Sequence, residues 1–196
     1  MKKISTLFKK DPNDLGRVIN EINPENSWVF TDDEVLPTRK YDGTACAIID
    51  GQLYKRYDVK KGKTVPEFAI PCQEPDAITG HWHWILCSWD NPGDKYHMEG
   101  FQNLLSQMQM FPGEFKANSL DGTYELCGEK VQGNPEKIEG HKLIRHGSFV
   151  IEDLTRPMTF ENLKGYLTYA DIEGIVFHHI DGRMCKLRKS DYGIKR

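Results

Sequence analysis

Lys40 is the residue of this chain whose type and neighbours most clearly suggest a catalytic role. It opens the run Lys40-Tyr41-Asp42-Gly43 and directly follows Arg39. An amine attacks phosphorus only in its neutral form, which desolvation or a neighbouring positive charge favours. Asp42 could orient the amine or a water on a metal, and Gly43 would permit a tight turn beside a ligand. Taken alone, however, such a run is more often the edge of a hairpin than a nucleophile site.

Further charged and aromatic residues that could take part in chemistry follow Lys40 along the chain. Successive side chains of a strand face opposite ways, so only one of two adjacent cations can face a given pocket. Cations two residues apart share a face. The residues concerned are the adjacent Lys55 and Arg56, then Glu125, Phe149 and Glu173, and finally Lys186 and Arg188, which are two residues apart.

The elements that must position these residues are a mixture of helices and hairpins. Apolar residues at helical spacing predict helices over 4–8, 14–23, 101–110 and 161–170. Alternating or β-branched runs predict strands over 28–30, 44–49, 52–57, 81–89, 122–127, 148–153, 174–179 and 184–188. An Asp-Gly turn joins 44–49 to 52–57. The pattern lacks βαβ alternation and indicates an α+β fold.

Composition limits the class of protein. The chain has 196 residues, 38% hydrophobic and 28% charged, with no apolar run of bilayer length, which predicts one soluble domain over 1–196 with a lead-in over 1–30. Five dispersed cysteines argue against a disulfide framework and for a reduced, cytoplasmic protein. Net charge is −3, but basic residues cluster around 55–63 and 183–196. These clusters are either solvated faces or a nucleic-acid surface.

Histidines and tryptophans alternate over 81–84. His81 and His83 would share one face of a strand, which could suit a metal, but a half-buried polar face is the more usual role. The tryptophans of this region are more often core residues than platforms for stacked bases.

The order of residues from 39 to 193 resembles that of the covalent nucleotidyltransferases, the superfamily of ATP-dependent DNA and RNA ligases and mRNA capping enzymes. The resemblance implies a two-sheet adenylation domain with ATP in a cleft between the sheets. It makes Lys40 the nucleophile, while Arg56 contacts ribose and the terminal phosphate. Glu125 binds the ribose hydroxyls and Phe149 stacks on the base. Arg39 departs from the pattern, because many relatives have an acid beside the lysine.

The same resemblance implies Mg²⁺ or Mn²⁺ held by Glu173, with Asp42 and Glu125 as further ligands through water. Lys186 and Arg188 would grip the phosphates, although relatives usually have lysine at both positions. The residues expected to contact ATP are therefore Arg39, Lys40, Asp42, Gly43, Arg56, Glu125, Phe149, Glu173, Lys186 and Arg188.

The segments "ELCGEKVQGNP" (125–135) and "HKLIRHG" (141–147) are similar to the small 5′-to-3′ RNA ligases of the vertebrate RNA ligase 1 type. This resemblance implies an ATP-dependent enzyme that joins RNA 5′-phosphate and 3′-hydroxyl ends through a lysyl-AMP. The residues expected to bind RNA are Lys55, Lys60, Lys61 and Lys189.

Three alternatives remain open: a DNA ligase, a capping guanylyltransferase, and a non-catalytic nucleotide- or RNA-binding module of the same fold. The chain ends eight residues after Arg188, where DNA ligases and capping enzymes carry an OB domain. We therefore expect the core or a partner protein to recognise the RNA ends.

Overall fold

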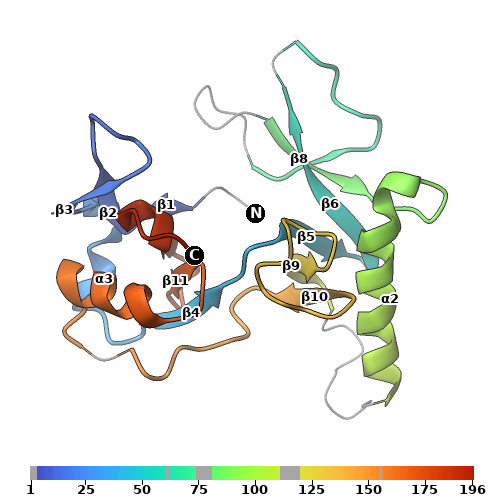
Figure 1. The fold of residues 1–196 in the computed structure, drawn as a ribbon. Helices are drawn as coiled ribbons and strands as arrows, with labels where there is room; N and C mark the ends of the chain where they lie inside the picture. Colours follow the sequence, from blue (N-terminus) through green and yellow to red (C-terminus); the bar gives the residue numbers. More distant parts are fainter. Residues whose placement is uncertain (1–3, 61, 74–80, 111–119, 155) are drawn as a thin grey trace. The chain divides into compact units, whose positions relative to one another are not determined.

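A computed structural model describes residues 4–60, 62–73, 81–110, 120–154 and 156–196 (Figure 1). The chain divides into two compact units. Unit 1 contains Asp42–His146, and unit 2 contains Ile4–Tyr41 and Gly147–Arg196. Unit 2 is thus assembled from two stretches that the sequence of unit 1 separates.

Unit 1 is an antiparallel sheet with one long helix. The six strands have the order β10-β9-β5-β6-β8-β7. Their bounds are β5 (Thr44–Ile49), β6 (Gln52–Val59), β7 (Ile70–Pro71), β8 (His81–Leu86), β9 (Gly122–Gly128) and β10 (His141–Arg145). The short 3₁₀ helix η2 (Pro92–Asp94) leads into α2 (Lys95–Met110), which packs against β10 and β6 (Figure 1).

The two faces of the unit 1 sheet differ in kind. Cys46, Ile48 and Leu53 lie on the face that packs against α2 and form the core of the unit. Residues that alternate with them, such as Ala45 and Arg56, lie on the opposite face. The predicted hairpin over 44–57 is confirmed. Its turn residues have positive φ angles, as an Asp-Gly hairpin turn requires.

Unit 2 contains a four-stranded sheet of order β1-β12-β11-β4 and a small pair β2-β3. The strand bounds are β1 (Ser5–Thr6), β2 (Phe8–Lys10), β3 (Val18–Ile22), β4 (Leu36–Lys40), β11 (Gly174–His178) and β12 (Met184–Arg188). The helices are η1 (Pro24–Asn26), α1 (Trp28–Thr31), α3 (Phe160–Tyr169) and η3 (Lys189–Tyr192). Leu163 and Leu167 of α3 share one core with Ile175 and Leu187 of the sheet.

Four sequence predictions for unit 2 are wrong. Residues 4–8 and 14–23 were expected to be helical, but they contain β1, β2 and β3; Leu15, placed on the apolar face of that helix, is 73% exposed. Residues 28–30 form α1 rather than a strand. Residues 148–153 make only an isolated bridge between Thr38 and Val150. Over 4–8 and 14–23, strand pairing with β12 and between β2 and β3 overrides the local helical spacing.

Several other predictions are confirmed. The late helix is α3, the last two strands are β11 and β12, and the helix predicted over 101–110 is the C-terminal part of α2. Among the described residues, no helix is long and apolar enough to cross a membrane.

Candidate active site

Three neighbouring strands of unit 2 place the central residues of the predicted site in one row. Gly174 opens β11 and lies opposite Lys40 of β4 on one side and opposite Arg188 of β12 on the other. A side chain at Gly174 is excluded, because its Cβ would overlap the carbonyl oxygen of Leu187 and approach the Cα of Arg188 to 2.8 Å. Residues that are opposite one another share a face of a sheet, so Lys40 and Arg188 point to the same side.

Lys40 forms an ion pair with Glu173, the residue immediately before β11. Its ammonium also donates a hydrogen bond to the carbonyl oxygen of Tyr41 at 3.3 Å. The carbonyl oxygen of Glu173 accepts from the backbone N–H of Lys189 at 2.9 Å, which fixes the start of β11 against η3. The structure therefore brings the predicted nucleophile and the predicted metal ligand into direct contact.

Lys186 lies on the same face as Arg188, two residues earlier in β12. Burial, together with the positive charges of Arg188 and Lys40, lowers the pKa of Lys186 to about 8. The side chain is therefore still mostly protonated at physiological pH, but it loses its proton at a lower pH than an ordinary lysine, and a negatively charged ligand would favour its protonated form.

Arg188 is tied to an acid that sequence analysis missed. Its guanidinium Nη2 donates to Asp191 Oδ1 at 2.9 Å, and its backbone N–H donates to Asp191 Oδ2 at 2.8 Å. The bond to Asp191 raises the pKa of Arg188. The spacing of three residues in "RKSD" was the available signal, since such pairs meet within one helical turn.

Arg39 and Phe149 are brought together by backbone pairing. The N–H of Arg39 donates to the carbonyl oxygen of Phe149 at 2.9 Å, and Phe149 is 53% exposed. Strand alternation directs Arg39 to the face opposite Lys40. Its guanidinium carbon lies 4.9 Å from the centroid of the Tyr41 ring.

In unit 1, Gly43 and Glu125 are in direct contact. The N–H of Gly43 donates to Glu125 Oε1 at 3.1 Å, and Glu125 Oε2 lies 2.9 Å from His146 Nε2. The other nitrogen of His146 lies 3.0 Å from Thr123 Oγ1. Gly43 is required because a Cβ there would overlap the carbonyl oxygen of Leu126, which is a different reason from the predicted tight turn. His146 is a functional candidate that residue type alone did not single out.

Lys55 and Arg56 face opposite sides of the unit 1 sheet, as expected for adjacent residues of a strand. Arg56 shares its face with Glu125, and its guanidinium carbon lies 4.7 Å from the centroid of the Trp82 ring. Lys55 faces α2 and forms an ion pair with Asp94, which is 1% exposed. Of these two cations, Arg56 is therefore the one on the face opposite α2.

The backbone N–H of Asp42 donates to Glu136 Oε1 at 2.8 Å, so the loop after β9 holds the residue next to Gly43.

The tryptophans differ in burial: Trp84 is buried, in agreement with a core role, whereas Trp89 is exposed. His83 is also buried, and the side chain of His81 is not among those that the structure describes.

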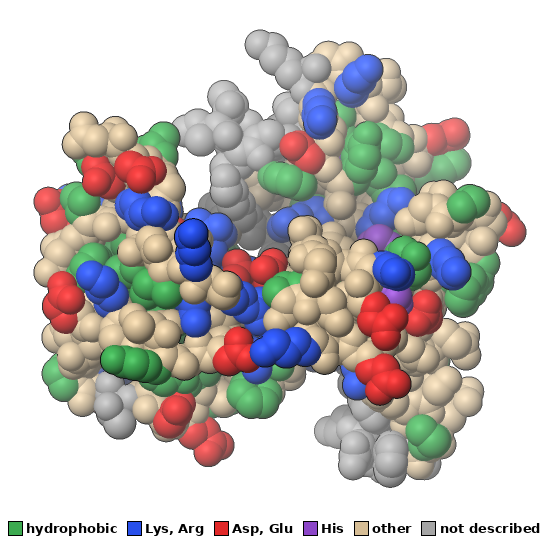
Figure 2. All heavy atoms as spheres, viewed as in Figure 1, with side chains coloured by type: hydrophobic (Ala, Val, Ile, Leu, Met, Phe, Trp, Pro, Cys, Tyr) green, Lys and Arg blue, Asp and Glu red, His purple; other side chains and the backbone are tan. Residues whose placement is uncertain are grey.

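The residues predicted to bind RNA differ in exposure. Lys60 is exposed, and Lys61 lies outside the described residues. Lys189 is only 8% exposed, which argues against a contact with RNA through its side chain. In the view of Figure 2, basic and acidic side chains are interspersed over the surface.

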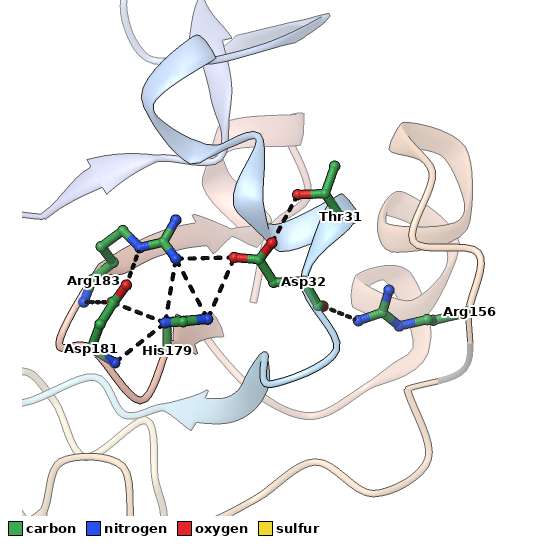
Figure 3. A network of polar contacts seen from close by, with 6 residues as sticks. All are labelled: Thr31, Asp32, Arg156, His179, Asp181 and Arg183. Atoms are coloured by element: carbon green, nitrogen blue, oxygen red, sulfur yellow. Dashed lines mark hydrogen bonds and ion pairs between the residues drawn. The ribbon is translucent and has the colours of Figure 1, made fainter.

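A polar network stabilises the turn between β11 and β12 (Figure 3). Glu173 immediately precedes β11, and Lys186 belongs to β12. Asp32, which follows α1, accepts from Arg183 Nη2 at 3.0 Å and lies 3.4 Å from His179. Asp181 bridges the same two residues, and hydrogen bonds from Arg183 lower its pKa. The network holds this hairpin against the end of α1.

Unit 2 also contains a largely apolar pocket of about 650 Å³. None of the predicted site residues lines it. The lining residues are Phe8, Asn20, Ile22, Phe30, Arg156, Pro157, Met158, Thr159 and Phe160. Among the described residues, no three His, Cys, Asp or Glu side chains form a group that could hold a metal ion.

Comparison with protein-family models and with curated proteins bears on the family of this chain. A search of curated proteins finds none that matches this chain. Residues 108–196 match the family model of RNA ligase 1. The matched part includes Glu125, Glu173, Lys186 and Arg188, but it begins after Lys40. The match supports an RNA ligase family and an activity related to RNA ligation.

Proposed function

We propose that this chain is an ATP-dependent RNA ligase of the lysine nucleotidyltransferase type. The observation that carries the proposal is the contact between Lys40 and Glu173, in a row with Arg188 across Gly174. A lysine, a carboxylate and a clamp of cations are what nucleotidyl transfer to an amine requires. The family match of residues 108–196 favours RNA as the substrate.

In the first step, Lys40 Nζ attacks the α-phosphorus of ATP. A nitrogen–phosphorus bond forms, the bond from the α-phosphorus to its bridging oxygen breaks, and pyrophosphate leaves. Glu173 holds the amine in place before the nucleotide binds, and the ammonium must lose a proton before attack. Lys186 and Arg188 stabilise the charge on the phosphoryl oxygens, because catalysis of such transfers rests mainly on positioning and electrostatics.

A divalent metal fits this arrangement. Mg²⁺ is commonly held by one or two carboxylates together with substrate phosphates and water, so Glu173 can contribute without a complete protein cage. When bound, Mg²⁺ or Mn²⁺ neutralises part of the charge on the phosphates. Asp42 and Glu125 remain proposed ligands through water.

The nucleoside part of ATP is assigned to other residues. We assign the ribose hydroxyls to Glu125, which Gly43 and His146 orient, and a phosphate contact to Arg56. The exposed ring of Phe149 is assigned to stacking on the adenine. These roles are proposals that rest on the family resemblance.

In the later steps, AMP passes from Lys40 to an RNA 5′-phosphate, and a 3′-hydroxyl then displaces it. Dividing one difficult condensation into three transfers lowers each barrier. Exposed cations such as Lys60 would attract the RNA backbone.

Ligation with matched substrates tests the proposal. RNA with a 5′-phosphate and a 3′-hydroxyl is incubated with ATP and Mg²⁺ or Mn²⁺, beside DNA of the same sequence and beside GTP. Joined RNA with ATP, lost in Lys40→Ala, supports an RNA ligase. Joining of DNA alone would indicate a DNA ligase, and a covalent GMP adduct would indicate a guanylyltransferase. RNA binding without any adduct would indicate a non-catalytic module.

A further inference from the structure

Asp191 is a fully buried acid that holds two cations from distant parts of the chain. Its Oδ1 accepts from Arg188 Nη2 at 2.9 Å and from Lys10 Nζ at 2.7 Å. Burial alone would raise the pKa of Asp191, but the hydrogen bonds from Arg188 and Lys10 lower it, so the carboxylate is ionised. Lys10 and Asp191 are 181 positions apart in the sequence.

The N-terminal strands bring Lys10 to this position. In β1, Thr6 pairs with Lys186 of β12, and the N–H of Leu7 donates to the carbonyl oxygen of Lys186 at 2.9 Å. The chain then enters β2, which ends at Lys10. β1 thus holds this N-terminal segment along β12, and Lys10 meets Arg188 of that strand at their shared acceptor, Asp191 Oδ1.

Lys10 and Arg188 are accessible to a ligand from solvent, whereas Asp191, the acid that they share, is not. The side chain of Asp191 is 0% exposed, whereas those of Lys10 and Arg188 are 28% and 32% exposed. A carboxylate that lies beneath two partly exposed cations neutralises only one of their two charges. The pair thus keeps a net positive charge toward solvent.

The charged side chains at and around the proposed clamp carry a net positive charge. Four cations face only two acids when Lys186 is protonated. They are Lys10, Lys40, Lys186 and Arg188, against Glu173 and Asp191. A ligand with several negative charges, such as a polyphosphate, complements this group.

We infer that Lys10 is a further phosphate-binding residue, which acts with Arg188 on the β- and γ-phosphates of ATP. This inference rests on the proposed function. Phosphoryl-type transfer places the leaving group roughly in line with the attacking atom and on its far side. In the order β4-β11-β12, Lys40 is at one edge and Arg188 is two strands away, with Lys10 attached to Arg188 through Asp191. The cations farthest from Lys40 therefore serve the pyrophosphate, and Asp191 is their positioning residue.

Lys10→Ala and Lys9→Ala form a matched pair for the test. Lys9 belongs to the same strand but pairs with Glu21 on the surface, 2.8 Å away. Lys10→Ala should raise the KM for ATP in adenylation about tenfold, the loss expected for one charge-assisted contact, and weaken inhibition by pyrophosphate to a similar extent. Lys9→Ala should stay within about twofold of the wild type. Lys10→Arg should restore most of the affinity, because it keeps the charge.

A second readout separates phosphate binding from a structural role. Transfer of AMP from preformed lysyl-AMP to RNA involves no pyrophosphate, so its rate should be unchanged in Lys10→Ala. If Lys10→Ala matches Lys9→Ala in KM and in pyrophosphate inhibition, or slows both steps equally, the inference is overturned while the proposed function stands. A wild-type protein that forms no lysyl-AMP would overturn both.

Discussion

The most quantitative prediction concerns the charge of Lys186. Burial and the neighbouring Arg188 and Lys40 lower its pKa to about 8, from an ordinary value of 10.5. The proposed clamp needs the cationic form, since only that form attracts phosphate oxygens. Affinity for the nucleotide should therefore be fully present below about pH 8 and should be lost as the pH rises through this value.

The magnitude follows from the fraction of Lys186 that is protonated. With a pKa of about 8, roughly nine tenths of the side chains carry a proton at pH 7 and roughly one tenth do at pH 9. If the nucleotide binds only to the protonated form, its Kd rises about tenfold between these two pH values. This change corresponds to about 1.4 kcal/mol of binding free energy.

The assay is calorimetric titration with α,β-methylene-ATP, which Lys40 cannot cleave. The terminal phosphate of this analogue also titrates, and the control for that effect is Lys186→Arg. Arginine stays protonated over the whole range, so the variant should lose much less affinity between pH 7 and pH 9. Thermal unfolding of both proteins at each pH confirms that they remain folded.

The comparison of the two proteins decides the outcome. Between pH 7 and pH 9, the Kd of the wild type should rise by a factor roughly ten times larger than the Kd of Lys186→Arg does. Parallel pH profiles would refute the role given to Lys186, and so would tighter binding by the wild type at pH 9 than at pH 7.

Three further predictions concern packing and charge. Gly174→Ala should destabilise unit 2 by about 1–3 kcal/mol and abolish adenylation, because no Cβ fits between the strands, whereas Gly165→Ala in α3 meets nothing within 4 Å and should raise Tm slightly. Lys55→Met removes the cation paired with the buried Asp94, which keeps hydrogen bonds from Ser88 and Asn91, and should cost about 3 kcal/mol in chemical denaturation; stability equal to that of Lys60→Met would contradict this. Lys60→Ala should reduce the slope of log affinity for single-stranded RNA against log salt concentration by about 0.7. An unchanged slope would show that Lys60 does not contact the RNA.

The parts of the fold that the sequence predicted are those with local causes. The hairpin of β5 and β6 has alternating residues and an Asp-Gly turn, and β12 begins and ends at the predicted residues. The errors fall where pairing or packing with another segment decides the structure. Apolar spacing over 14–23 suggested a helix, but Val18–Ile22 pairs with β2 instead, and the sheet pairing outweighs local propensity.

The candidate site shows the same division. The order of motifs placed Lys40, Glu173 and Arg188 in one site, and strand register brings these three together within unit 2. Their supporting residues were not predicted. Lys10 and Asp191 meet only because β1 is laid alongside β12, and this contact has no local trace in the sequence.

The central claim is that Lys40 becomes covalently adenylated, and mass spectrometry tests it most directly. The protein is incubated with ATP and Mg²⁺ or Mn²⁺, its intact mass is measured, and the modified peptide is mapped, with Lys40→Ala as the control. The account predicts that the mass of one AMP is added, that the adduct maps to Lys40, and that the variant gains nothing. An adduct on another residue, or no adduct with either metal and either ATP or GTP, would contradict it.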